Sequence, residues 1–377
     1  MGTVPAVSSK PNPPNPSDSS SDPASNANGP KRGFFGRVSD FLHRHKALMW
    51  WGHSIYALGL GVMVILFAAK GFEHARILAA TLGAAFLLLL LLFRLFGHGD
   101  AQREKVEEKR SAKVRFVLMT YVLKNLYQGM LFFLLPFYWN SSTIDSMNGW
   151  FVFVLGVLAF ISTMDIIFDH LLMRYRMLAA TFYTMTLFAC MNLVIPALFP
   201  NVRTIVTLMT SAALAVLGFS LLHFPMGSFK EKRRLIYVAV AMVAFAFAVF
   251  FARVAIPPVP LYVMHAAVGP AQLADGRLAL EVGRLHYTLL DDMIAVTDVA
   301  LPGGEGDAFR HVWRYRDGDF RLVVEATRRS SDRKNGARLV STLRRDQLPD
   351  DIIGDWTVDV VTIDDQIVGR ARFTVIE

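Results

Sequence analysis

The sequence predicts an α-helical membrane bundle of seven transmembrane helices, followed by an all-β, Ig-like antiparallel sandwich. Three observations support this fold class: clustered apolar runs, basic residues in alternate loops, and a change to period-two patterning near residue 270. Of the 377 residues, 53% are hydrophobic and the mean hydropathy is +0.38. Soluble domains are usually about 45–50% apolar with glycine included, so the excess indicates a membrane protein.

Seven apolar runs between residues 47 and 255 define the predicted transmembrane domain. Each run is about 20 residues long, enough to cross a hydrocarbon core of about 30 Å. The first run follows a polar segment and has full span length, so we expect a retained signal-anchor and no cleaved signal peptide. The predicted helices are 49–70, 76–97, 115–138, 149–169, 177–198, 203–223 and 234–254.

The distribution of charge predicts the orientation of the chain. The net charge is +8, of which the first 255 residues carry about +12 and the remainder about −4. Lysine and arginine are concentrated before the first span and after the second, fourth and sixth, whereas "NSSTIDSMNGW" after the third has neither, and Trp139 and Trp150 bracket it as aromatic anchors. By the positive-inside rule, the N-terminus is cytoplasmic and the C-terminal domain lies on the opposite side. Because the basic residues lie mainly in the alternate loops of one predicted side, their distribution indicates membrane topology and does not indicate nucleic-acid binding.

Two segments precede the first span. Residues 1–30 are rich in Pro, Ser and Asn, which predicts a disordered cytoplasmic tail. In residues 31–46, Phe34, Val38 and Phe41 recur at helical spacing among charged residues, which favours an amphipathic helix in the headgroup layer. An extension of the first span is the alternative.

After the seventh span the patterning changes to that of strands. Residues 256–270 begin with "IPPVP", which cannot continue a helix and predicts a stiff connector. Residues 271–377 alternate apolar and polar side chains between turn signals, which predicts a sandwich of about seven strands, with hairpin turns at "RDGD" and "IDDQ". The predicted strands are 277–282, 293–301, 309–318, 320–329, 337–345, 356–364 and 366–377. The single cysteine, Cys190, lies in the fifth span, so this domain has no disulfide.

Polar side chains interrupt the third span, "YVLKNLYQGMLFFLLPFYW". At 100° per residue, Tyr121, Lys124, Asn125 and Gln128 fall within about one third of the helix circumference. A charge at the bilayer centre costs about 2.5–3.5 kcal/mol on insertion scales, so Lys124 requires a partner.

The fourth span provides that partner. Asp165 and Asp169 share one face of the predicted helix with Ser162, and His170 lies beside them. Comparing depths along the antiparallel helices predicts an ion pair between Lys124 and Asp165. Three interpretations of the cluster remain open: a structural clasp between helices, a ligand, ion or proton site, and catalysis.

The β-domain contains a second set of candidate residues. His311 and Trp313 are two residues apart and therefore point to the same side of one strand. Together with Trp356 they form either an aromatic-lined ligand site or part of the sandwich core. Nothing in the sequence matches H-E-x-x-H, G-x-S-x-G or a phosphate-binding loop, so we assign no catalytic residue, no metal site and no cofactor.

The C-terminal motifs resemble those of a known family. "IPPVPL" over 256–261, His311-Val312-Trp313, Gly354-Asp355-Trp356-Thr357-Val358, Gly369 and Phe373 are similar to an uncharacterised bacterial inner-membrane family. That family combines a multi-helix membrane region with a C-terminal domain, both of unknown function, and the resemblance covers about residues 47–377. It implies a bacterial inner membrane and a periplasmic β-domain. The family pattern often has Arg where this chain has Thr357, so no role transfers to that position.

These observations predict a non-enzymatic binding, sensing or scaffolding protein. Its partners are expected to be the lipid bilayer and a protein, lipid or glycan of the cell envelope, which the periplasmic sandwich would engage. The alternative is a small transporter or permease that uses the Lys124 and Asp165 cluster.

Overall fold

The computed structural model describes residues 83–84, 91, 110–164, 175–224, 229–274, 276–289, 292–315, 320–330 and 336–377, and the side chains from residue 125 onward with few exceptions. These residues all fall within one unit of the chain, His53–Glu377. The predicted tail (1–30), the amphipathic helix (31–46) and the first two spans lie outside the described residues, except that 83, 84 and 91 are helical.

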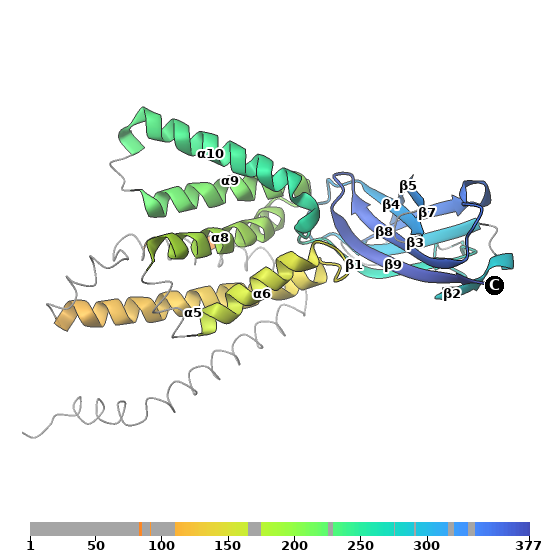
Figure 1. The fold of residues 1–377 in the computed structure, drawn as a ribbon, viewed down its shortest axis with the longest axis horizontal. Coiled ribbons are helices and arrows are strands. Elements are labelled where there is room, and N and C mark those ends of the chain that lie inside the picture. The colour runs from red at the N-terminus through yellow and green to blue at the C-terminus, as the bar shows by residue number, and fades with distance from the viewer. Residues whose placement is uncertain are drawn as a thin grey trace, which may run out of the picture. The chain divides into compact units, whose positions relative to one another are not determined.

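Five helices of 15 residues or more are described, and each overlaps a predicted span (Figure 1). By length and apolar composition, the last three can cross a membrane, over Met177–Leu198, Thr204–His223 and Lys232–Phe251, and α6 is a shorter apolar helix. The helices are α5 (Arg110–Asn140), α6 (Gly149–Thr163), α8 (Arg176–Leu198), α9 (Thr204–His223) and α10 (Lys232–Phe251).

Helix α6 ends at Thr163 and is therefore shorter than the predicted helix over 149–169. Its last hydroxyls bond backwards to the helix: Ser162 Oγ donates to Ala159 O and Thr163 Oγ1 donates to Phe160 O, each at 2.6 Å. Such bonds compete with the backbone ladder. Met164 then adopts an extended backbone, with a ψ of 103°.

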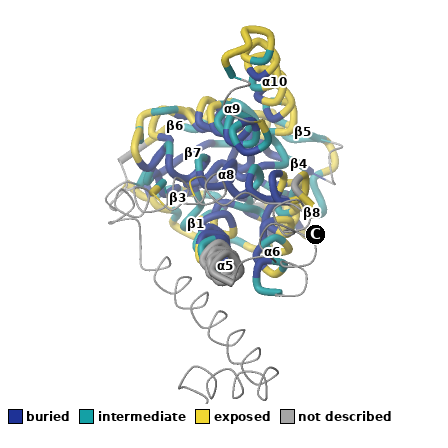
Figure 2. The backbone as a smooth tube through the Cα atoms, turned by 90° about the vertical axis from the view of Figure 1, so that its left-hand side faces the viewer, coloured by how far each residue is buried: buried dark blue, intermediate teal, exposed yellow. Residues whose placement is uncertain are grey.

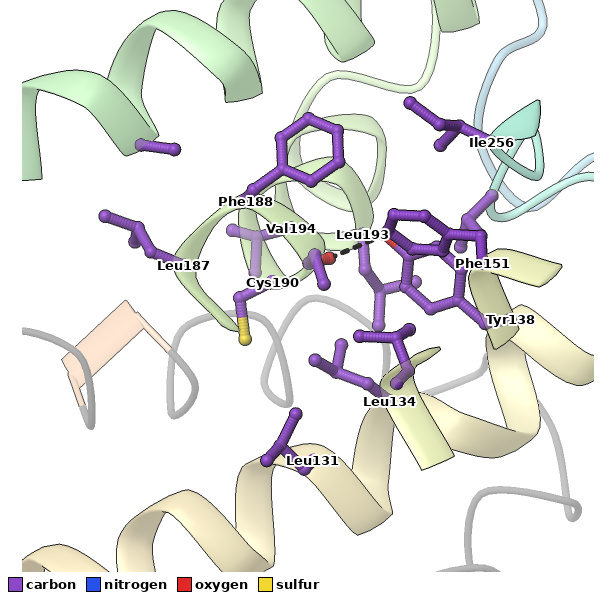
Figure 3. Close-up of a cluster of buried hydrophobic side chains, with 14 of the residues drawn as sticks. Leu131, Leu134, Tyr138, Phe151, Leu187, Phe188, Cys190, Leu193, Val194 and Ile256 are labelled. Atoms are coloured by element: carbon purple, nitrogen blue, oxygen red, sulfur yellow. Dashed lines mark hydrogen bonds between the residues drawn. The ribbon is translucent and has the colours of Figure 1, made fainter. Parts of the chain in front are cut away.

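Helices α5, α6 and α8 share an apolar core (Figure 3). Leu131 of α5, Phe151 of α6 and Phe188 of α8 are buried in it. The hydroxyl of Tyr138 donates a hydrogen bond to Ala189 O at 2.9 Å, which satisfies a polar group inside this core.

The surfaces of α9 and α10 differ. Small residues let α9 approach α8 closely: a Cβ on Gly218 would lie 2.4 Å from Leu187 Cδ2. Such packing is typical of membrane helices. Most of α10 is exposed instead (Figure 2), including Tyr237, Phe247 and Phe251. An exposed apolar face of this length is typical of contact with lipid.

In the described part of the chain, nine strands form two packed sheets, with the orders β1-β3-β7-β6 and β2-β9-β8-β4-β5. The pair β2 and β9 is parallel, and the other paired strands are antiparallel. The strands are β1 (Tyr262–Gly269), β2 (Arg284–His286), β3 (Asp292–Ala300), β4 (Phe309–Tyr315), β5 (Phe320–Glu325), β6 (Thr327–Ser330), β7 (Gly336–Arg344), β8 (Gly354–Thr362) and β9 (Ile367–Ile376).

The structure departs from the predicted strands at four places, of which one is the short strand β2, which was not predicted. Strand β1 lies inside the segment 256–270 that was predicted to be a connector, and it pairs with β3. The strand predicted at 277–282 is wrong, because this segment folds back onto the end of β1, with Val282 N donating to Val268 O at 2.9 Å, and forms only an isolated bridge. The segment 320–329 forms two strands in different sheets.

The turn between β8 and β9 is the hairpin that "IDDQ" predicted. Asp365 N donates to Thr362 O at 3.0 Å, and Asp365 has a φ of 65°, the left-handed conformation that Asp tolerates in turns. The turn predicted at 316–319, between the paired strands β4 and β5, lies outside the described residues.

Candidate functional site

The two tryptophans of the β-domain lie in the sandwich core. Trp313 is 0% exposed and Trp356 is 1% exposed. Trp356 stacks on Tyr315, with ring centroids 4.8 Å apart, and its Nε1 donates to Ile352 O at 2.9 Å. These contacts fill the interior with aromatic rings, so in this conformation neither ring faces a ligand in solvent.

His311 is buried beside Trp313. Its Nδ1 is 2.6 Å from Ser341 Oγ, which also accepts a 3.3 Å hydrogen bond from Trp313 Nε1. Its Nε2 has no hydrogen-bond partner. Burial lowers the pKa of His311 from 6.5 to about 4, so the ring is neutral at physiological pH.

The buried histidine predicts a pH-dependent stability. Because its pKa is about 4 in the folded chain and 6.5 when unfolded, the unfolded state binds more protons within that window. The free energy of unfolding should therefore fall by up to about 3 kcal/mol as the pH decreases through it. Pulse proteolysis of the sandwich in urea, at pH values of about 7 and 4.5, measures this. His311→Gln should reduce the difference, whereas His286→Gln, at an exposed residue, should leave it intact; equal behaviour of both variants would contradict the assignment.

Most of the predicted intramembrane cluster lies outside the described side chains. This applies to Tyr121, Lys124, Asp165, Asp169 and His170. Because α6 ends at Thr163, the shared helical face that was predicted to present the two aspartates is not formed by α6.

Two members of that cluster are described. Asn125 is partly buried, and Gln128 is 4% exposed with no partner for its Nε2. Their polar stripe thus faces the protein interior. The ion pair between Lys124 and Asp165, and the transporter alternative that rests on it, stay predictions.

Among the described residues, a dense set of polar contacts lies where the helices meet the sandwich, and sequence reasoning did not identify it. We call this region the junction. On the helical side it comprises the segments 141–148, 199–204 and 252–261, and on the sandwich side 301–307 and 363–367. Hydrogen bonds between residues more than 100 positions apart join the two sides.

The aspartates of the β8–β9 turn bind arginines from two helix ends. Asp364 pairs with Arg203, before α9, at 2.5 Å. The Nε of Arg253, after α10, donates to Asp364 O at 2.6 Å. Asp365 accepts a 3.0 Å hydrogen bond from Arg310 of β4. The turn is therefore fixed from several directions by charge-assisted hydrogen bonds.

Buried amides add three further contacts at the junction. Thr204 Oγ1 donates to Gln366 Oε1 at 3.0 Å, and Gln366 Nε2 is 3.5 Å from Ile256 O. Asn148 Nδ2, from the loop before α6, donates to Ile367 O at 2.9 Å. The start of β9 is thus bonded to the segments flanking α6, α9 and α10.

A glycine-rich loop, "LPGGEGD" over 301–307, makes the second contact surface. A Cβ on Gly303 would lie 2.7 Å from Pro196 O, and one on Gly306 would lie 2.4 Å from Asn201 O. Gly304 has a φ of 72°, the left-handed region. The absence of side chains lets the backbone of this loop touch the end of α8 and the turn that follows it.

Asp307 ends that loop and caps α9. Its Oδ2 accepts a 3.0 Å hydrogen bond from the backbone N–H of Thr204, the first residue of α9. Arg203, at the N-cap position, makes no side-chain cap. A carboxylate at a helix N-terminus satisfies a free N–H group and interacts favourably with the helix dipole.

The loop 141–148 also contacts the outer face of the second sheet. Asp145 pairs with Arg372 of β9, while Arg370 donates two hydrogen bonds, at 2.5 and 3.0 Å, to the fully buried Asp359 of β8. Trp139 and Trp150 flank this loop and are 58% and 70% exposed, as expected for rings at a membrane surface.

The junction therefore combines buried hydrogen bonds, ion pairs and close backbone contacts, which hold two structural elements together. Within the described ranges, no group of three or more His, Cys, Asp or Glu residues could hold a metal ion. Two local sequence signals mark the junction, the glycines of "LPGGEGD" and the adjacent aspartates of "IDDQ". Neither signal indicates the partner residues, which lie far away in the sequence.

Comparisons with known proteins place most of the chain in two family models. One, described as "Family of unknown function (DUF5924)", matches residues 32–279, and one described as "Protein of unknown function (DUF2914)" matches residues 307–375. The comparison with curated proteins gives no match. A solved structure of Pseudomonas fluorescens alkylpurine DNA glycosylase AlkC bound to DNA containing an abasic site analog matches with 10% identity and a TM-score of 0.21, over 79% of this chain and 98% of that one. A TM-score this low carries no argument about fold or function.

Proposed function

The chain belongs to the family of unknown function DUF5924, and from this premise we propose that it is a multi-pass inner-membrane protein with a periplasmic sandwich. In this proposal the sandwich binds a protein, lipid or glycan of the cell envelope and performs no catalysis. The membrane domain has seven helices, of which the first two fall at 49–70 and 76–97.

The junction is the observation that carries this proposal. A domain that only needs to move freely on a tether has no use for buried bonds to several helices. Here Asn148, Thr204 and Arg253 each bond to the β8–β9 hairpin. A sandwich held in this way would present its free surface at a fixed height above the bilayer, which suits a scaffold or a sensor.

The same contacts support the proposed orientation. The segments 141–148, 199–204 and 252–261 all contact the sandwich. They follow the third, fifth and seventh predicted spans, and alternation places all three on the side opposite the basic loops. The first family segment also extends through β1, so part of the sandwich comes from the same segment as the helices.

Native mass spectrometry tests the proposal. The full-length protein, released gently from its own membranes, should retain an envelope protein, lipid or glycan. A variant that lacks residues 257–377 should lose it, because the whole sandwich is removed. A bare full-length protein under conditions that preserve known complexes would contradict the proposal. So would a component that the truncated variant retains equally well.

A further inference from the structure

Asp307 combines burial with an incomplete set of hydrogen bonds. The residue is 4% exposed, and its Oδ2 accepts the Thr204 N–H. Its Oδ1 has no hydrogen-bond partner. A buried carboxylate oxygen without a donor is costly when the group is charged, and much less so when it is protonated.

The charged groups around Asp307 do not compensate for this cost. Arg203 approaches from the segment before α9, but it is already paired with Asp364 of the β8–β9 turn at 2.5 Å. Asp364 faces Asp307 as a second negative charge. Glu305 lies two residues away on the same loop, where its backbone N–H donates to Pro200 O at 2.8 Å. Among the described residues, Asp364 therefore opposes the effect of Arg203 on Asp307, while Arg328 approaches the same loop only at a backbone oxygen, with Nη1 3.3 Å from Glu305 O.

We propose that Asp307 is a proton-operated latch, which tightens the docking of the sandwich on α9 when protonated and loosens it when ionised. This inference rests on the proposed function, in which the junction fixes the position of the sandwich. The ligand is a proton from the compartment that contains the sandwich. The consequence is that the sandwich would be held more firmly in acid.

The direction of the effect follows from burial. Burial raises the pKa of Asp307 from 3.8 to about 6, despite hydrogen bonds from Thr204 and the charge of Arg203, which lower it. The docked form therefore binds a proton more tightly than a solvated Asp307 would. Docking should strengthen as the pH falls from about 7 towards 4, with a limit on the order of 100-fold in the docking equilibrium.

Distance measurements between two spin labels test the latch in the full-length chain in lipid nanodiscs. In a Cys190→Ala background, the labels are placed at Ile144→Cys in the loop before α6 and Asp346→Cys on the sandwich, both exposed residues. Between pH values of about 7.5 and 5, the ratio of docked to undocked wild-type chains should rise by about tenfold, so the distance distribution should narrow onto the docked distance. The protease resistance of the sandwich is measured at both pH values as well, because His311 already lowers its stability as the pH falls below 6.5.

Two variants assign that change to one residue. Asp307→Asn mimics the protonated acid and should give the docked distance at both pH values. Asp350→Asn, at an exposed aspartate of the sandwich, should respond to pH as the wild type does. A wild-type distance that stays at the docked value at both pH values would overturn the latch but not the docked geometry. This measurement does not depend on whether any variant folds. A pH response that persists in Asp307→Asn would also overturn it, and a sandwich undocked at both pH values would overturn the proposed function as well.

Discussion

Replacing Trp313 with alanine should unfold the sandwich and leave the membrane helices inserted. The ring is completely buried, packs edge-to-face on Phe373 with centroids 6.3 Å apart, and donates to Ser341 Oγ. Removing a buried tryptophan costs about 3–5 kcal/mol, which is a large part of the stability of a domain of this size. Thermal melting of the full-length protein, followed by the protease resistance of the sandwich, measures the loss.

Val323→Ala provides the matched control, because Val323 lies on the edge strand β5 with 42% of its surface exposed. We expect this variant to melt close to the wild type. A Trp313→Ala protein with a folded sandwich and altered ligand binding would show that the ring belongs to a binding site and not to the core.

Adding one methyl group at Gly306 should detach a folded sandwich from the helices. A Cβ there would lie 2.4 Å from Asn201 O, and a backbone oxygen cannot rotate away as a side chain can. Overpacking of this kind typically costs about 1–3 kcal/mol. Because the contact joins the sandwich to the turn after α8, the substitution should weaken the free energy of docking and leave the sandwich folded. The spin-label distance between the loop before α6 and the sandwich should broaden in Gly306→Ala.

Gly283→Ala is the control for this substitution, since nothing lies within 4 Å of the position its Cβ would occupy. It should keep the docked distance, and both variants should keep the protease resistance of the sandwich. If Gly306→Ala docks as tightly as Gly283→Ala, the close contact of the glycine-rich loop does not hold the junction.

The helices were predictable because membrane spans are selected by length and apolar composition. The bounds of α8 and α9 differ from the predicted ones by a single residue at most. The error at the end of α6 has a different cause. Hydropathy does not register that the backbone becomes extended at Met164, with a ψ of 103°.

The strands were predictable where alternation coincides with a packed face. Trp356, Val358 and Val360 of β8 all point into the core, as their period-two spacing indicates. Alternation does not reveal a partner strand, and a strand that lacks one does not form. This explains why 277–282 was wrongly predicted as a strand. Strand β1 was missed because it directly follows prolines that were interpreted as part of a connector.

The junction could not be predicted in the same way, because its contacts are between distant parts of the chain. Asn148 and Ile367 are separated by 219 positions, and Arg203 and Asp364 by 161. Local patterning carries no information about such pairs. The polar residues around Lys124 could be identified from the sequence because they interrupt an apolar run, and their role stays a prediction.

The cap on α9 has a consequence for biosynthesis. Thr204 is translated 103 residues before Asp307 is made. During that interval the first turn of α9 has no cap from its own N-cap residue, and the surrounding loops have no sandwich to bind. In the proposed topology, the helices therefore reach their final state only after the sandwich has been translocated and folded. Ribosomes stalled before residue 301 should expose an immature 199–204 segment, which quality-control proteases could distinguish from the finished protein.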